Sequence, residues 1–246
     1  VDTPNDFGRM GSAPSHPELL DWLAAEFRDG GGSFKRLHRL ILTSAVYQQS
    51  SRGNPKAAEM DADNALLWRM NRIRLDAESV HDAVLQFSGK LDLTMFGPSV
   101  KQFIESPGVH VTPVVDYETF AVDAPGNCRR SVYRFVFRTL PDPFMEALDC
   151  PDASQLTPKR NTSVTALQAL ALWNDKFIVR QAEHFAARLE KDATNLSERV
   201  AKACELVWNR RPTGREAEAL SHYAERHGLA NCCRLLLNSS EFVFVD

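Results

Sequence analysis

The chain has 246 residues, of which 43% are hydrophobic and 25% are charged. This is the balance of an ordinary globular protein that can bury a sizeable core. The formal net charge of -3 argues against binding to a polyanion, and we expect no nucleic-acid partner. The longest apolar runs, such as residues 166–173, are far shorter than the ~20 residues of a transmembrane helix, so we expect no membrane span.

The chain begins at Val1 and shows no initiator methionine, basic n-region or apolar h-region. We therefore interpret it as an excised part of a larger protein. Its five cysteines form no CxxC or CxxCH motif, which excludes the usual zinc-knuckle, thioredoxin-like and c-type haem attachment sites. We expect no cofactor in this part of the protein. The cysteines are expected to be buried small apolar residues, with a Cys128–Cys150 disulfide as the alternative.

The N-terminal third predicts a helical hairpin. Apolar residues at helical spacing predict a helix over residues 17–29 with Ser15 as its N-cap. Three glycines at 30–32 then break the chain, and Ser33 is expected to cap a second helix over residues 34–48. Residues 49–63 are expected to be a loop, followed by helices over 65–70 and 76–88.

The pattern changes between residues 89 and 163. Eight prolines fall in this stretch, helical periodicity disappears, and two β-prone runs appear, VHVTPVV at 109–115 and SVYRFVF at 131–137. Aromatic residues between the prolines need burial, so we expect an ordered irregular insert containing a short β-hairpin.

Helical periodicity returns at residues 163–190, 196–209, 213–226 and 229–238, with a capping box at Thr213 and Glu216. Residues 234–242 also repeat the pattern of residues 39–47, which suggests a duplicated hairpin; chance similarity between amphipathic helices is the alternative. The sequence thus predicts a mainly α fold in which helical hairpins at both ends pack on a long central helix over 163–190. We expect a single domain over 1–246, made of a helical part (1–88), the proline-rich insert (89–163) and a second helical part (164–246).

Five stretches carry a resemblance to a known family: residues 3–27 (TPNDFGRMGSAPSHPELLDWLAAEF), 37–51 (LHRLILTSAVYQQSS), 129–138 (RRSVYRFVFR), 148–186 (LDCPDASQLTPKRNTSVTALQALALWNDKFIVRQAEHFA) and 210–220 (RRPTGREAEAL). They resemble the planctomycete-specific domain-one family of unknown function. The resemblance implies a periplasmic or extracellular protein with further domains upstream, often including a cytochrome-c-like haem domain. It also implies a setting in polysaccharide degradation or redox chemistry, without identifying a reaction.

Known catalytic and metal-binding signatures are incomplete in this sequence. Glu78 and His81 have the i, i+3 spacing of a helical metal-binding pair, but no second E-x-x-H motif exists, so we expect no metal. No G-x-S-x-G, P-loop or G-x-G-x-x-G motif is present.

Polar residues in the stretches that carry the resemblance form the candidate site: Asp6, Arg9, His16, Arg129, Arg130, Tyr133, Asp142, Asp149, Asp152, Gln155 and Arg160. On rigid proline-containing loops they could line a concave site for a sugar or a carboxylate. The alternative is that they hold irregular loops together by capping and by ion pairs, because loop backbone groups must be satisfied somewhere.

The sequence leaves open whether the protein is an enzyme. The favoured hypothesis is a ligand-binding or assembly module of an exported multidomain protein, engaged with carbohydrate or with another domain of the same protein. One alternative is a polysaccharide hydrolase or lyase that uses Asp142, Asp149 or Asp152 as acid or base, with Arg129, Arg130 or Arg160 holding an anionic group. Another is a docking domain for an upstream haem domain, which predicts an exposed apolar patch.

Overall fold

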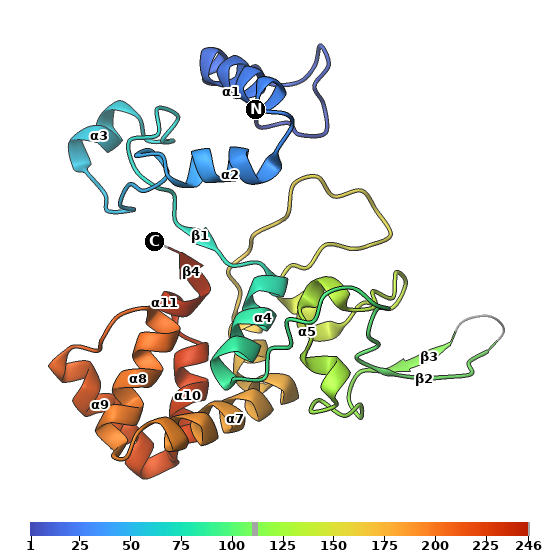
Figure 1. Cartoon of the computed structure of the whole chain (residues 1–246), viewed down its shortest axis with the longest axis vertical. Coiled ribbons are helices and arrows are strands. Elements are labelled where there is room, and N and C mark those ends of the chain that lie inside the picture. The colour runs from blue at the N-terminus through green and yellow to red at the C-terminus, as the bar shows by residue number, and fades with distance from the viewer. Residues whose placement is uncertain (110–112, 246) are drawn as a thin grey trace. The chain divides into compact units, whose positions relative to one another are not determined.

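The computed structural model describes residues 1–109 and 113–245 (Figure 1). It is mainly helical with short antiparallel strands, as the sequence predicts. The chain divides into two compact units, residues 1–73 and residues 74–245. The expected single-domain organisation over 1–246 stays a prediction, and the two units are described separately here.

The first unit contains three helices: α1 (Pro17–Asp29), α2 (Phe34–Leu42) and α3 (Pro55–Met60). The predicted hairpin of α1 and α2 is confirmed, and the rings of Phe27 and Phe34 pack 5.0 Å apart between them. Ser33 caps α2 as expected, because its side chain accepts a hydrogen bond from the backbone N–H of Arg36. The second helix ends at Leu42, six residues earlier than predicted. Because this hairpin lies in the first unit, its packing on the central helix stays a prediction.

Three further assignments in the first unit are wrong. The helix predicted at 65–70 does not form, because Asn64 and Leu67 have φ of 55° and 57° and the Asn64 side chain bonds the backbone of Arg69. Such side-chain bonds compete with the helical ladder. The loop predicted at 49–63 contains α3, which Asn54 caps and Pro55 begins. The Asn-Pro pair is a helix-start signal that the sequence analysis did not use. The N-cap of α1 is His16 and not Ser15.

The second unit contains most of the helices. Its elements in chain order are β1 (Ile73–Arg74, whose last residue opens the unit), α4 (Ala77–Ser88), β2 (Ile104–Ser106), β3 (Val114–Asp116), α5 (Pro143–Ala147), α6 (Ala166–Asn174), α7 (Lys176–Asp192), α8 (Leu196–Trp208), α9 (Gly214–His227), α10 (Leu229–Leu237), α11 (Ser240–Val243) and β4 (Phe244–Val245). Short 3₁₀ turns at Pro125–Cys128 and Ser131–Tyr133 lie in the insert.

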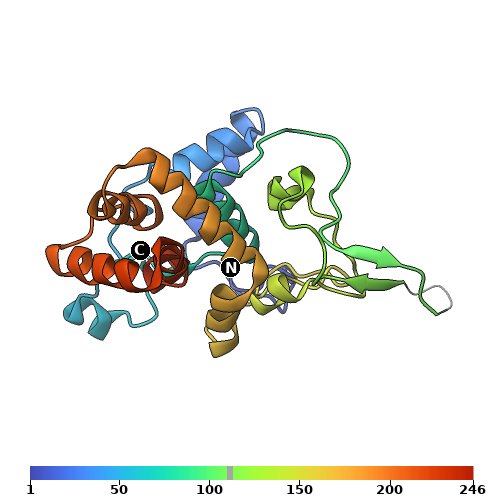
Figure 2. The ribbon, with the colours of Figure 1, turned by 90° about the horizontal axis from the view of Figure 1, so that it is seen from below.

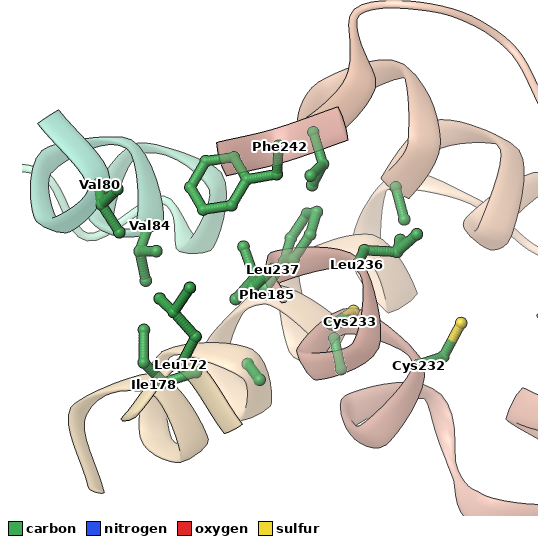
Figure 3. Close-up of a cluster of buried hydrophobic side chains, with 14 of the residues drawn as sticks. Val80, Val84, Leu172, Ile178, Phe185, Cys232, Cys233, Leu236, Leu237 and Phe242 are labelled. Carbon is green, nitrogen blue, oxygen red and sulfur yellow. The ribbon is translucent and has the colours of Figure 1, made fainter. Parts of the chain in front are cut away.

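The core of this unit forms where α4, α7, α8 and α10 meet. α10 packs along α7, which confirms that the C-terminal hairpin of α9 and α10 packs on a central helix. Figure 3 shows side chains from several helices converging there, among them Val84 of α4, Phe185 of α7, Leu237 of α10 and Phe242 of α11. All five cysteines are free thiols and four of them are buried, so they act as small apolar residues and the alternative Cys128–Cys150 disulfide is wrong.

The long helix predicted over 163–190 is interrupted. α6 ends at Asn174 and α7 begins at Lys176, with Asp175 in an extended conformation between them. The Asp175 carboxylate accepts a hydrogen bond from the backbone N–H of Phe177 at 2.8 Å and so caps α7. No proline or glycine marks this break, so the spacing of the apolar residues predicts one continuous helix there.

The insert contains the predicted β-hairpin. β2 and β3 pair antiparallel with Ile104 opposite Asp116, and both views show them extending away from the helices of this unit (Figures 1 and 2). β3 includes the end of the predicted run at 109–115, of which residues 110–112 lie outside the described residues. The run at 131–137 does not form a strand of the hairpin. It begins as a 3₁₀ turn. The carbonyl of Tyr133 then accepts a hydrogen bond from the backbone N–H of Val100, and the backbone N–H of Phe135 donates to the carbonyl of Val100.

The repeated segments share a local structure. Both α2 and α10 end at the equivalent residues Leu42 and Leu237. In the first copy the Ser44 hydroxyl donates to the carbonyl of Ile41 at 2.7 Å, and in the second the Ser239 hydroxyl donates to that of Leu236 at the same distance. The resemblance between the two segments therefore extends from the sequence to the way each helix ends.

We expect substitutions of a buried and of an exposed leucine to differ in their effect on the free energy of unfolding. Leu189 is 0% exposed on α7, whereas Leu167 is 70% exposed on α6. We expect Leu189→Ala to lower the free energy of unfolding by about 2–5 kcal/mol, and Leu167→Ala to change it by less than about 0.5 kcal/mol. Urea unfolding followed by circular dichroism measures both. Equal losses in the two variants would contradict the described core.

Candidate functional site

The candidate residues of the first unit make local contacts. The Asp6 carboxylate accepts a hydrogen bond from the backbone N–H of Gly8 at 2.8 Å, and the His16 ring lies 3.1 Å from the Ser15 hydroxyl. Asp6 and Arg9 are exposed. These contacts stabilise a turn and the start of α1, and they do not form a pocket.

Asp149 is the most heavily bonded of the candidates. Its carboxylate accepts hydrogen bonds from Arg74 at 2.8 Å, from the backbone N–H of Ser163 at 2.7 Å and from Gln168 at 3.0 Å. The Ser163 hydroxyl adds a further bond at 2.9 Å. Burial alone would raise the pKa of Asp149, but these donors and the Arg74 charge hold it below the ordinary value. Asp149 thus joins the starts of α4 and α6 to the end of α5, which is a structural role.

Arg129, Arg130 and Tyr133 hold the loop at residues 94–98. The Arg129 guanidinium donates to the carbonyls of Pro98 and Thr94 at 3.1 Å each and lies 3.7 Å above the Tyr133 ring. The Tyr133 hydroxyl accepts a hydrogen bond from a backbone N–H of the same loop at 2.8 Å. Arg130 reaches Met95. These three residues therefore act as loop supports.

The remaining insert residues are also engaged. Asp152 bonds the backbone and hydroxyl of Ser154, and the backbone N–H of Gln155 donates to the Asp152 carbonyl. Arg160 makes two hydrogen bonds to the Glu78 carboxylate, at 2.6 and 2.9 Å. The Glu78–His81 pair is therefore divided, since Glu78 faces Arg160. Among the described residues, no three His, Cys, Asp or Glu side chains are grouped to hold a metal ion.

An ion pair between Arg134 and Asp142 lies in the lining of two hollows in the second unit. Asp142 also caps α5 through the backbone N–H groups of Phe144 and Met145. Tyr117, Arg134 and Asp142 line both hollows. The smaller hollow has a volume of about 40 Å³ and is named the inner cavity because the buried His81 lines it. The larger hollow has a volume of about 430 Å³ and is named the outer cleft.

Aromatic rings form one side of the outer cleft. Tyr117, Phe135 and Phe137 line it, and all three pack edge-on around the buried Phe103 with ring centroids 5.5–6.0 Å apart. Glu146 of α5 and the loop at 150–154 also line this cleft. Arg138, also in the lining, donates to the carbonyl of Ala153 at 3.2 Å. The outer cleft therefore combines a rigid aromatic surface with charged side chains.

The inner cavity contains a histidine that the sequence analysis considered only as half of a metal pair. His81 on α4 is 3% exposed, and its ring stacks on Phe177 with centroids 4.4 Å apart. Its Nδ1 lies 3.2 Å from Asp82 Oδ1 and 3.0 Å from Ser131 Oγ. Ser131 in turn donates to Asp82 from its hydroxyl at 2.8 Å and from its backbone N–H at 2.7 Å.

Charge in and around the inner cavity follows from burial. Burial lowers the pKa of His81 and so favours the neutral ring. Burial raises the pKa of Asp175, which also lines the cavity. Burial alone would raise the pKa of Asp82, but the hydrogen bonds from His81 and Ser131 outweigh burial and lower the pKa. Asp82 is thus an ionised partner beside a neutral histidine.

Comparison with known proteins places the chain in a family. A family model, PSD1, described as a protein of unknown function (DUF1553), matches residues 1–224. The chain belongs to the PSD1 family. No curated protein and no solved structure matches it. The description of the PSD1 family names no activity. No helix among the described residues of the PSD1 chain is long and apolar enough to cross a bilayer.

The structural role of Asp149 predicts a large effect of its removal. Arg74 is only 5% exposed at its side chain, so Asp149→Ala would leave a buried guanidinium without its carboxylate. We expect the free energy of unfolding of the PSD1 chain to fall by about 3 kcal/mol. Asp152→Ala, which removes an exposed carboxylate three residues away, is the matched control and should show no comparable loss in urea unfolding. Equal behaviour of the two variants would refute the structural role.

The lowered pKa of His81 predicts a pH dependence of stability. As the pH falls below about 6.5, the unfolded chain binds a proton at His81 before the folded chain does. The free energy of unfolding should therefore fall with acidification and level off below the folded pKa. Asp82, Arg134 and Asp142 act on His81 and remain unchanged in a His81→Asn variant. Unfolding measured from pH 7.5 to 5 should show a smaller acid loss in that variant, and identical slopes would contradict a neutral buried His81.

Proposed function

We propose that this protein is a carbohydrate-binding module and that the outer cleft holds the sugar. The observation that carries the proposal is the row of Tyr117, Phe135 and Phe137 along a cleft of about 430 Å³. A sugar ring presents an apolar face of C–H groups that packs on an aromatic ring, and hydroxyl groups at its edge that bond polar side chains. Ligand sites typically combine an apolar wall with a few placed polar groups.

The ring arrangement suits a preformed site. Phe103 is 6% exposed and supports the three lining rings from behind, so they need little ordering when a ligand binds. Preorganisation lowers the entropy cost of binding. Phe135 is 38% exposed, which makes it the most exposed of the three rings.

The charges of the cleft favour a neutral sugar. Glu78 is paired with Arg160, and Asp142 with Arg134, so these four side chains largely cancel. What remains is Arg138, with Glu146 and Asp152 as two carboxylates. An anionic sugar would face a slight excess of negative charge, whereas hydroxyl groups can donate to the Glu146 carboxylate and accept from the guanidinium.

The carboxylates proposed from sequence for a hydrolase or lyase do not support that alternative. Asp142 caps α5 and pairs with Arg134, while Asp149 accepts hydrogen bonds from Arg74, Ser163 and Gln168. Asp152 bonds Ser154. A carboxylate that acts as general acid or base needs a free oxygen directed at the substrate.

The cellular setting forms a further part of the proposal. A periplasmic or extracellular location, and association with other domains of the same protein, including a haem domain, are supported only by the family resemblance.

The proposal is tested by titrating the protein with neutral oligosaccharides, namely cello-, xylo- and mannohexaose, by isothermal calorimetry. We expect at least one of them to bind, and Phe135→Ala to weaken that binding about tenfold, since one lost stacking contact is worth about 1.4 kcal/mol. Val132→Ala is the matched control because Val132 is 77% exposed and lies outside the cleft lining. Absence of binding by all three sugars, or equal affinity in the two variants, would refute the proposal.

A further inference from the structure

We propose that the inner cavity is an ester-hydrolysing site in which His81, oriented by Asp82, is the general base toward a water molecule. The substrate is a carbohydrate that carries a small acyl ester. This inference rests on the proposed function, because the outer cleft would hold the sugar while its ester group reaches the inner cavity beside Tyr117, Arg134 and Asp142, which line both hollows.

The orientation of His81 is fixed by its neighbours. An ionised carboxylate only accepts hydrogen bonds, so the contact with Asp82 Oδ1 at 3.2 Å places a proton on Nδ1 of His81. Ser131 holds the Asp82 carboxylate from its backbone N–H and its hydroxyl. The neutral ring then carries its lone pair on Nε2, for which the described residues offer no hydrogen-bond partner. This is the tautomer that a histidine general base needs.

His81 is positioned to act on something inside the protein. Its side chain is 3% exposed and lines the inner cavity, and the ring stacks on Phe177. Nε2 has no hydrogen-bond partner among the described residues, so it is available to a water molecule or a ligand in the inner cavity.

Water is the nucleophile that the geometry allows. The Ser131 hydroxyl bonds Asp82 and Nδ1 of His81. Nδ1 and Nε2 lie on different edges of the ring, so Nε2 does not take a proton from this hydroxyl. Cys150 lines the outer cleft, and burial raises the pKa of its thiol, which disfavours a thiolate.

The size of the inner cavity limits the substrate. About 40 Å³ accommodates roughly three water molecules at roughly 10–15 Å³ each. That is room for an attacking water and a two-carbon acyl group, but not for a sugar ring. Phe144 and Phe177, with ring centroids 5.7 Å apart, give the acyl methyl an apolar surface. Arg134 brings a positive charge and a buried Nε–H without a partner among the described residues, suited to a developing oxyanion.

The reaction balances without any further reagent. Nε2 of His81 takes a proton from water as the water oxygen bonds the ester carbonyl carbon, giving a tetrahedral oxyanion. The oxyanion collapses, the bond between the carbonyl carbon and the sugar oxygen breaks, and the protonated His81 returns its proton to that oxygen. One ester and one water give one carboxylic acid and one free hydroxyl group. Asp82 is a positioning residue that stabilises the imidazolium and does not touch the substrate.

The chemistry is tested on the whole chain with p-nitrophenyl acetate, which carries the acetyl group without the sugar. We expect the protein to accelerate release of p-nitrophenolate, and His81→Gln to lower the rate at least about 100-fold. His222→Gln, on the exposed side of α9, is the matched control and should keep the full rate. Asp82→Asn should lower the rate and shift its pH profile. No acceleration by the wild-type protein, or an unchanged rate in His81→Gln, would overturn the inference.

A second measurement does not depend on any variant folding. ¹⁵N chemical shifts of the His81 ring in the wild-type protein at pH 7.5 should show a protonated Nδ1 and an unprotonated Nε2. The reverse tautomer would overturn the general-base role. Titration of His81→Gln with the three hexasaccharides separates the two proposals, because sugar binding should persist when hydrolysis is lost. Hydrolysis that depends on His81 without any sugar binding would leave the inner site standing and remove the proposed function.

Discussion

The contact on which the second unit depends is the ion pair between Arg74 and Asp149. Arg74 is nearly fully buried, and a buried guanidinium is tolerated only beside a carboxylate whose remaining lone pairs are also satisfied. Ser163 and Gln168 supply those donors, so three chain segments meet at one carboxyl group. Asp149 does this from a left-handed backbone conformation, with φ of 60°. The end of α5 and the start of α6 are therefore fixed relative to α4, and Asp142 at the start of α5 lines both hollows.

The two hollows of the second unit differ in size and in lining. The outer cleft is wide, aromatic and only slightly charged, whereas the inner cavity is narrow and lined by groups whose pKa values burial has moved, His81 and Asp175. Perturbed pKa values gather at functional sites more often than elsewhere, although ion-pair networks also produce them. Here the free edge of the His81 ring distinguishes the inner cavity from the purely structural network around Asp149.

Helices with a local start signal were predictable from sequence. Ser33, Asp76 and Thr213 cap the helices expected after them, and the mainly α fold with one short hairpin followed from periodicity and proline content. What failed depended on contacts distant in sequence or on side chains that replace backbone bonds. Asp175 divides a continuous periodic stretch, and Asn64 replaces a predicted helix with a loop. The site was missed for the same reason: His81 and Ser131 are 50 residues apart and share no motif. The sequence indicated the arginines and aspartates as a candidate binding site, but in the structure most of them stabilise loops.

The matching ends of α2 and α10 bear on how much of this fold is encoded locally. α2 has no buried residue, whereas α10 buries Cys232, Cys233, Leu236 and Leu237. Yet each helix stops at the same point of the repeated segment and is closed by the same serine hydroxyl. The stop therefore does not require the packing of a core. A short segment that ends a helix in such different surroundings acts as a helix C-terminal signal that does not depend on its context. Grafted onto an unrelated helix, it should end that helix at the leucine two residues before the serine.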